Sequence, residues 1–137
     1  PFYFIRKSRY EISVKRVVNK IIDRENHEKK IMVESKDGLV AIDTANIIYA
    51  VSQDHYITIF TTDDNYVIRK SMTELENELK NYFINRAHKK YLVNYRFVKK
   101  INSSTGEVLL VTGETIRLGR NYKDIFEKGL VLYYRTL

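Results

Sequence analysis

A run of basic side chains between residues 86 and 100 carries the most definite chemistry in this sequence. Six lysines and arginines fall in this stretch, and no acidic residue does; they are Arg86, Lys89, Lys90, Arg96, Lys99 and Lys100. Directly before it, residues 72–83 hold three glutamates against one lysine. Lysine and arginine neutralise phosphates, and such contacts supply most of the affinity for nucleic acid that does not depend on base sequence. On charge alone, the stretch is either a surface for a polyanion or a solvated basic loop.

Residues that could support enzymatic chemistry lack the spacing that such chemistry requires. The three histidines, His27, His55 and His88, belong to no metal-binding pattern, so a zinc site would have to assemble from distant residues. Asp63 and Asp64 lack the spaced oxygen ligands of a calcium loop and fit a turn better. The glycines form no phosphate-binding loop, and the absence of cysteine excludes disulfides, thiolate zinc sites and cysteine nucleophiles. We therefore predict no catalytic residue, no metal site, no cofactor and no enzymatic activity.

Length and charge set broad limits on the kind of protein. At 137 residues the chain has the size of one domain with an appendage, and its net charge of +7 favours a polyanionic partner. No run of about 18 apolar residues occurs, so no membrane-spanning segment is predicted. The lack of cysteine and of a secretory signal fits a cytoplasmic protein. The chain begins at Pro1 and not at Met, which indicates a fragment of a longer protein.

The elements that position these residues follow from the spacing of apolar side chains. Over residues 9–25 the apolar residues recur at helical period and form one stripe; they are Val14, Val17, Val18, Ile21 and Ile22. A polar tract at residues 23–30 is either a linker or the end of this amphipathic helix, and a domain boundary is predicted near residue 28. Beyond it, the period changes to that of strands.

Short strands and one inserted helix make up the remainder. Apolar segments predict strands at residues 31–34, 39–42, 47–51, 55–61, 66–69, 91–94, 97–101, 107–111 and 114–118. Ser71 and Glu74 have the spacing of a capping box, which starts a helix that ends near residue 83. Residues 85–90 are expected to be an exposed basic loop, and a short helix is expected at residues 122–128. The predicted fold is therefore mainly β, with one inserted helix and the N-terminal amphipathic helix.

Three segments together resemble the LytTR DNA-binding domain of bacterial response regulators. They are residues 71–79 (SMTELENEL), 83–94 (FINRAHKKYLVN) and 116–122 (IRLGRNY), and the resemblance extends over roughly residues 29–130. It implies small antiparallel β-sheets stacked side by side with one short helix. It also implies a transcription regulator, either an activator or a repressor, that binds duplex DNA through loops in successive major grooves and through backbone contacts. The sites implied are paired direct repeats in promoters.

The motif also implies roles for individual residues. His55, Lys89 and Arg120 take the positions of residues that contact DNA bases. Arginine can bond both guanine O6 and N7, lysine can reach the same edge, and histidine can donate or accept. Contacts to the DNA backbone are expected from Arg86, His88, Lys90, Tyr91, Lys99 and Asn121. Lys90 departs from the family pattern, since a small hydroxyl residue commonly stands there, and it adds charge at that contact.

The first residues resemble the end of a receiver domain of a two-component system. This resemblance rests on residues 1–7 (PFYFIRK). We therefore expect residues 1–28 to be the end of a receiver domain with a linker helix, and residues 29–137 to be the DNA-binding domain. The partners so implied are double-stranded promoter DNA, a second copy of the chain on DNA, and a sensor histidine kinase acting on a receiver domain outside this sequence. No membrane partner is expected.

A different class of function remains compatible with the same basic stretch. An RNA-binding or protein-interaction β module would also use residues 86–100, and eleven tyrosines could supply exposed rings on which RNA bases stack. Single-stranded RNA that competes better than duplex promoter DNA would favour this alternative. Stoichiometric zinc would favour an enzyme.

Overall fold

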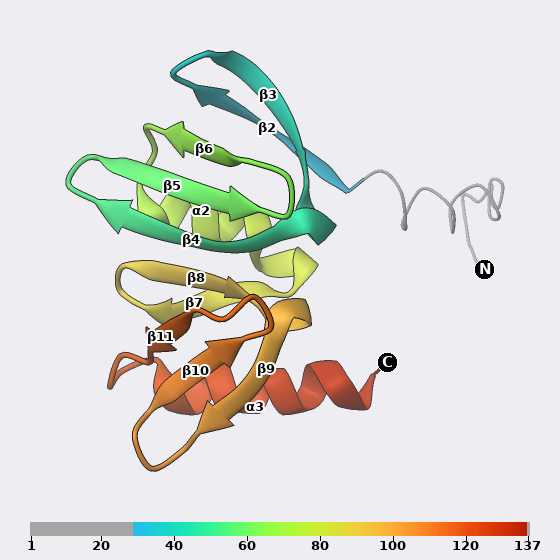
Figure 1. Ribbon diagram of the computed structural model, residues 1–137, viewed down its shortest axis with the longest axis vertical. Coiled ribbons are helices and arrows are strands. Elements are labelled where there is room, and N and C mark those ends of the chain that lie inside the picture. Colours follow the sequence, from blue (N-terminus) through green and yellow to red (C-terminus); the bar gives the residue numbers. More distant parts are fainter. Residues whose placement is uncertain (1–28, 137) are drawn as a thin grey trace, which may run out of the picture. The chain divides into compact units, whose positions relative to one another are not determined.

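The alternating segments of the sequence pair into two antiparallel sheets in the computed structural model, which describes residues 29–136 (Figure 1). The first sheet has the strand order β3-β2-β6-β5-β4-β8-β7, and the second has the order β11-β10-β9. The strands of the first are β2 (Lys30–Ser35), β3 (Gly38–Asp43), β4 (Ile47–Gln53), β5 (Tyr56–Thr61), β6 (Asn65–Ile68), β7 (Ile84–His88) and β8 (Tyr91–Asn94). Those of the second are β9 (Val98–Asn102), β10 (Glu107–Leu110) and β11 (Thr115–Arg117). The predicted class, antiparallel sheets side by side with an inserted helix, is confirmed, while the helix predicted at residues 9–25 lies outside the described residues.

The inserted helix, α2 (Met72–Leu79), starts where the sequence predicts a capping box. The Glu74 N–H donates to Ser71 Oγ and the Ser71 N–H donates to Glu74 Oε1, each at 3.1 Å. These bonds satisfy two backbone donors at the helix start. A 3₁₀ turn, η2 (Lys80–Tyr82), continues the helix, and Phe83 ends it with a φ of 66°. The buried apolar side chains of α2 pack on the first sheet.

Two segments differ from the prediction. The expectation that residues 85–90 form an exposed loop was wrong, because most of them belong to strand β7 and only Lys89 and Lys90 make the turn to β8. Hydrogen bonds to β8 hold this polar segment in a strand. The last helix, α3 (Lys123–Arg135), also extends past the predicted end at residue 128.

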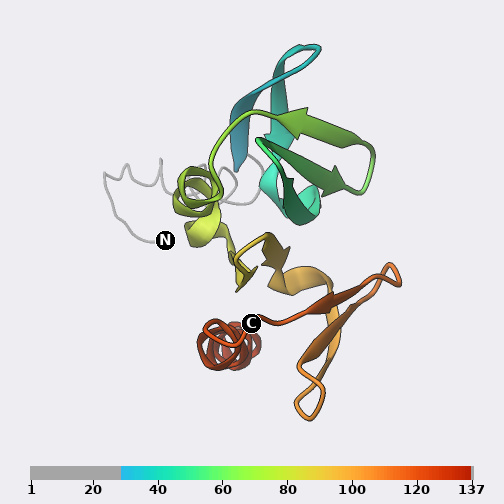
Figure 2. The ribbon, with the colours of Figure 1, turned by 90° about the vertical axis from the view of Figure 1, so that its left-hand side faces the viewer.

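Two apolar cores lie on opposite faces of the central strands. Consecutive residues of a strand point to opposite faces, and accordingly Leu92 belongs to the core against α2 while Val93 belongs to the core against α3. In β4 the near-continuous apolar run is buried on both faces, with a β-bulge between Ile47 and Tyr49. Both helices lie behind the strands in the view of Figure 1, and Figure 2 shows them nearly end-on. The central strands are therefore a rigid base for the turns at their ends.

Helix α3 packs at close range against the 3₁₀ turn η3 (Tyr95–Phe97). The Tyr95 hydroxyl donates to Phe126 O at 3.1 Å, and the two ring centroids are 4.9 Å apart. A Cβ on Gly129 would stand 2.2 Å from the Tyr95 hydroxyl oxygen, so this close approach requires glycine. Burial raises the pKa of Tyr95 to about 12, which keeps the hydroxyl protonated. A third 3₁₀ turn, η1 (Thr44–Asn46), joins β3 to β4.

Candidate nucleic-acid interface

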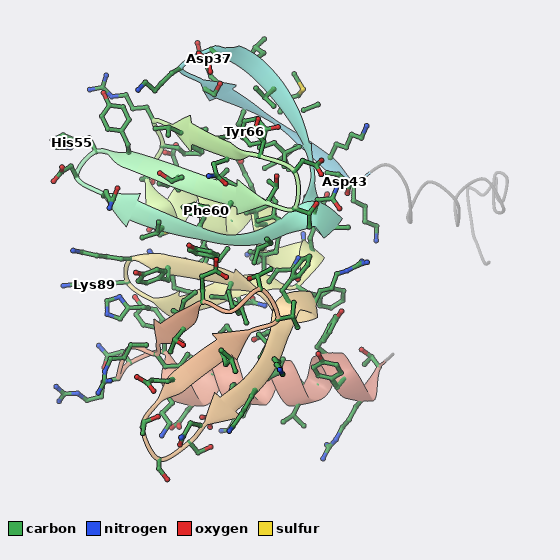
Figure 3. The ribbon with its side chains drawn as sticks, viewed as in Figure 1. Asp37, Asp43, His55, Phe60, Tyr66 and Lys89 are labelled. Atoms are coloured by element: carbon green, nitrogen blue, oxygen red, sulfur yellow. The ribbon has the colours of Figure 1, made fainter. Side chains whose placement is uncertain are left out.

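Three turns on one edge of the strands carry the residues that the sequence analysis assigns to DNA bases. His55 lies in the β4–β5 turn, Lys89 in the β7–β8 turn and Arg120 in the loop between β11 and α3, and all three are exposed. Figure 1 shows the three turns at the same side of the strands, and Figure 3 shows His55 and Lys89 at that edge. The fold therefore brings together residues that lie far apart in the sequence.

Backbone hydrogen bonds join these turns in series. The Ser52 N–H, at the end of β4, donates to Lys90 O at 2.9 Å, which links the β4–β5 turn to the β7–β8 turn. The Gly119 N–H donates to Ala87 O at 2.8 Å, which links β7 to the β11–α3 loop. Because adjacent strands lie about 4.8 Å apart, the outer two turns are separated by roughly 17–19 Å.

The β4–β5 turn places His55 beside two basic residues of another segment. Asp54, beside His55, adopts a left-handed φ of 54°, a conformation that aspartate tolerates better than most residues. The groove next to this turn is lined by Arg69 and Lys70, which follow β6. The guanidinium carbon of Arg69 stands 5.7 Å from the centroid of the Tyr56 ring. Positive charge beside this turn therefore comes from Arg69 and Lys70, which follow a different strand, and Lys70 is paired with Glu78.

His88 supports the β7–β8 turn through a hydrogen bond and a ring contact. Its Nδ1 accepts a hydrogen bond from the Lys90 N–H at 3.2 Å, and its ring meets the half-buried Tyr91 ring edge-on at 5.9 Å. Burial, followed by the charges of Lys89 and Lys90, lowers the pKa of His88. A lowered pKa favours the neutral ring, and only a neutral ring offers Nδ1 as an acceptor.

Gly119 lets the β11–α3 loop lie directly against β7. A Cβ at this position would stand 3.1 Å from Tyr122 Cδ2 and 3.3 Å from His88 Cδ2. The Gly119 carbonyl accepts from the Tyr122 N–H at 2.9 Å. This closes a tight turn whose intervening residues, Arg120 and Asn121, are exposed. The close packing of the glycine thus fixes the base from which both side chains project.

Arg86 is held within the protein. Its Nη1 lies 3.2 Å from Glu76 Oε1 on α2, and only 13% of its side chain is exposed. Its guanidinium carbon stands 5.6 Å from the centroid of the Tyr122 ring. Arg86 therefore connects α2 to the loop that carries Arg120, and the phosphate contact expected of it stays a prediction.

The residues expected to contact the DNA backbone are not all gathered at the turns. Lys90 and Asn121 lie in the same turns as the expected base contacts and are exposed. Lys99 is exposed but follows Val98, whose carbonyl accepts a hydrogen bond from the Tyr134 hydroxyl near the end of α3. Because the β11–α3 loop adjoins the first turn of that helix, Lys99 lies toward the helix's other end.

Three further cations lie along the edge. Arg69 borders the His55 turn, and Arg117 and Lys123 line a pocket together with Arg120. No short-range pattern in the sequence identifies them, because each comes from a different element and only the fold brings them beside the turns. The edge thus concentrates positive charge in the way that phosphate binding requires.

The described residues contain no obvious site for metal-dependent chemistry. Within residues 29–136, no group of three histidine, aspartate or glutamate side chains is placed to hold a metal ion. In the same range, no helix is both long and apolar enough to cross a membrane.

A family model and several curated proteins match the sequence. The family model is described as the LytTr DNA-binding domain and matches residues 37–130. Sensory transduction protein LytT of Bacillus subtilis (strain 168) is 26% identical over 123 residues, which cover 85% of this chain and 51% of that protein. Transcriptional regulatory protein LytR of Staphylococcus aureus (strain N315) is 24% identical over 110 residues, 78% of this chain and 45% of that protein. The chain spans about half the length of these curated relatives.

A solved structure shares the fold. The LytTr DNA-binding domain of a Bacillus cereus response regulator superimposes with a TM-score of 0.65 at 21% sequence identity. The match covers 74% of this chain and 96% of that chain. At this identity the likeness bears on the arrangement of sheets and helices.

Proposed function

The chain belongs to the LytTr DNA-binding domain family, and we propose that it binds specific sequences of duplex DNA as part of a bacterial transcription regulator. The descriptions of its relatives as a sensory transduction protein and a transcriptional regulatory protein support this role. Binding, and not catalysis, is the activity that we assign to it.

The observation that carries the proposal is the row of three exposed turns joined by backbone hydrogen bonds. On one face of B-DNA, major grooves about 12 Å wide recur about every 34 Å, which leaves about 22 Å between the facing edges of successive grooves. The outer turns are roughly 17–19 Å apart, a few ångströms less than this gap, so the long side chains at these turns must extend outwards to enter two neighbouring grooves across the intervening backbone. We propose His55, Lys89 and Arg120 as the base contacts, with the first and last in neighbouring grooves.

Phosphate contacts are proposed for the exposed residues that flank these positions. Lys90 and Asn121 stand in the same turns as the base contacts, so a duplex seated on the turns meets both. His88 and Tyr91 stand behind the turn and are partly covered, which suits them to support it. For Arg86, the ion pair with α2 favours a positioning role over a phosphate contact.

The assembly of two chains on promoter DNA, and its control by a kinase, are proposed from membership of the family alone. Each chain presents one row of turns, so a site of two direct repeats in a promoter takes two copies. Phosphorylation of a receiver domain by a sensor histidine kinase is the proposed control, and it acts outside the described residues.

Selection from random duplex DNA, followed by sequencing, tests the proposal. We expect a defined motif, and a plot of log K against log salt with a slope of about −4 to −5 if four to six phosphates are neutralised. Arg120→Ala should cost about 1–3 kcal/mol and relax specificity at one position of the motif. Arg135→Ala removes an exposed arginine from the far end of α3 and serves as the matched control.

Three results would count against the proposal. DNA binding that does not depend on salt concentration would rule out the proposed phosphate contacts. A loss for Arg120→Ala that is equal on all duplexes would make Arg120 a backbone contact. Single-stranded RNA that competes better than the selected duplex would favour an RNA-binding module instead.

A further inference from the structure

A pocket at the end of the row of turns has the lining of an anion site. It lies where the β9–β10 turn meets the β11–α3 loop. Its polar lining includes Ser104, Thr105, Arg117, Arg120 and Lys123. Three of these side chains are cations and two carry hydroxyl groups, a combination that suits the oxygens of a phosphate.

Hydrogen bonds hold the two sides of this pocket together. The Lys123 ammonium donates to Ser103 O at 2.8 Å. The Leu118 N–H donates to Gly106 O at 2.7 Å. Within the β9–β10 turn, Asn102 Oδ1 accepts from two backbone N–H groups, at 3.0 and 3.2 Å. The pocket is therefore formed by the fold and not by the chance approach of long side chains.

The acidic neighbour of the pocket, Glu107, does not neutralise it. Its carboxylate lies 3.8 Å from the Arg117 guanidinium, and the two side chains are 43% and 72% exposed. Solvent screens an ion pair of this kind, which contributes little. Arg117 therefore remains available to a second anion, and the charge of the pocket stays positive.

We propose that this pocket seats a phosphate of the DNA backbone next to the bases that Arg120 contacts. The inference rests on the proposed function, since a duplex that presents bases to Arg120 brings its own backbone to Lys123 and Arg117. Ser104 and Thr105 have short side chains and reach only a group that enters the pocket, and the Thr105 hydroxyl, which donates to Glu107 Oε1 at 3.4 Å, would exchange that long bond for one to a phosphate oxygen. A phosphate protrudes from the duplex far enough to do so, whereas base edges lie at the groove floor.

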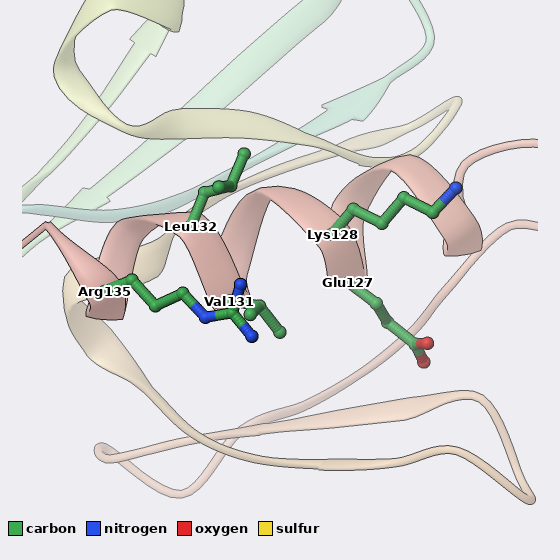
Figure 4. A pocket seen from close by; sticks show the side chains of 5 residues that line it. All are labelled: Glu127, Lys128, Val131, Leu132 and Arg135. Atoms are coloured by element: carbon green, nitrogen blue, oxygen red, sulfur yellow. The ribbon is translucent and has the colours of Figure 1, made fainter.

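Two lysines of the same helix provide a matched comparison. Lys123→Gln removes a cation from the pocket, and Lys128→Gln removes one outside it. Lys128 lines a separate groove with Val131, Leu132 and Arg135 (Figure 4). The change at Lys123 loses the hydrogen bond to Ser103 O but also removes a cation that opposes the helix dipole in the first turn, so the two effects on folding have opposite signs.

Binding to the selected duplex is then measured over a series of salt concentrations. We expect Lys123→Gln to reduce the magnitude of the salt slope by about 0.9 and to weaken binding roughly tenfold. The loss of affinity should be the same for the selected duplex and for an unrelated duplex. Lys128→Gln should change neither the salt slope nor the affinity. Glu107→Gln should act in the opposite direction and strengthen binding. An unchanged slope for Lys123→Gln would overturn the inference.

The source of the phosphate is tested on the DNA. One neutral methylphosphonate linkage is placed in turn at each backbone position near the Arg120 contact. At one of these positions, the neutral linkage should weaken binding by the wild-type chain but not binding by Lys123→Gln. Inorganic phosphate at constant ionic strength is the other arm. If inorganic phosphate stabilises the free wild-type protein but not Lys123→Gln, and if the salt slope of DNA binding is the same for both, the pocket binds a free anion and not the DNA backbone. If the wild-type chain selects no duplex, the proposed function itself fails, and that outcome is distinct from either result.

Discussion

Replacing Glu76 with glutamine removes a negative charge from a DNA-binding chain, yet we expect the change to weaken specific binding. The reason is the position of Arg86, whose guanidinium is bonded to Glu76 at 3.2 Å and stands 5.6 Å from the Tyr122 ring centroid. Without Glu76, the guanidinium loses the partner that keeps it beside Tyr122. The loop that carries Arg120 then loses support from α2.

The cost to folding follows from the burial of the pair. Removing one partner of a fully buried ion pair costs about 3–5 kcal/mol, whereas exposed pairs are worth about 0–1 kcal/mol. The side chains of Arg86 and Glu76 are 13% and 32% exposed, so we expect an intermediate loss of about 1–2 kcal/mol in the free energy of unfolding. For a domain of this size, that lowers Tm by about 5–10 °C.

The assay measures Kd for the selected duplex and for duplexes with single base changes, at several salt concentrations. If Arg86 positions the loop, Glu76→Gln should reduce the difference in Kd between duplexes that differ at the base contacted by Arg120. The salt slope should stay unchanged. If Arg86 instead contacts a phosphate, freeing it should strengthen binding to every duplex and steepen the slope by about 0.9. The two roles thus predict changes of opposite sign.

Glu78→Gln is the control for this experiment, because it makes the same charge change on the same helix. Glu78 pairs with Lys70, and the side chains are 40% and 23% exposed. Its removal should raise DNA affinity slightly and leave base discrimination intact. Stronger binding by Glu76→Gln, with a steeper slope, would refute the positioning role of Arg86.

Three further changes probe the scaffold. Gly129→Ala should destabilise by about 1–3 kcal/mol in urea unfolding, because its Cβ would meet the Tyr95 hydroxyl, and adding Tyr95→Phe should recover part of the loss. Asn94→Ala should cost about 1–3 kcal/mol, since the buried amide donates to Ile47 O at 2.8 Å. The pKa of His88 is lower in the folded protein than in the unfolded chain, so the unfolded chain binds the proton at higher pH. The free energy of unfolding should therefore fall as the pH drops below 6.5. His88→Gln should flatten this dependence when unfolding is measured from neutral pH to about pH 5.

Local signals were enough for much of the fold. The capping box at Ser71 and Glu74 depends on side chains three residues apart, so its geometry follows from the sequence alone. Strands such as β5 show their alternation directly, with Ile57 and Ile59 buried and Thr58 between them half-buried. In each case, the information that decides the structure lies within a few residues.

Strand β7 and helix α3 were misjudged because the deciding partner lies elsewhere. The segment Asn85–His88 is largely polar, and its pairing with β8 makes it a strand. Gly129 weakens helix propensity and suggests an end near residue 128, but the structure uses this glycine to bring α3 against Tyr95. The partners of Arg86 are likewise set by tertiary packing, so its ion pair with Glu76 does not follow from the sequence, while its expected DNA contact stays a prediction.

The positions of the proposed base contacts and their identities rest on different parts of the chain. The positions depend on ladder hydrogen bonds and on the packing of Gly119 against His88, none of which involves the side chains of His55, Lys89 or Arg120. Those three side chains are exposed, so exchanging them alters little of the packing that stabilises the fold. A scaffold of this kind can therefore change the DNA sequence that it recognises at small cost in stability, whereas changes at Gly119 alter the geometry of recognition itself.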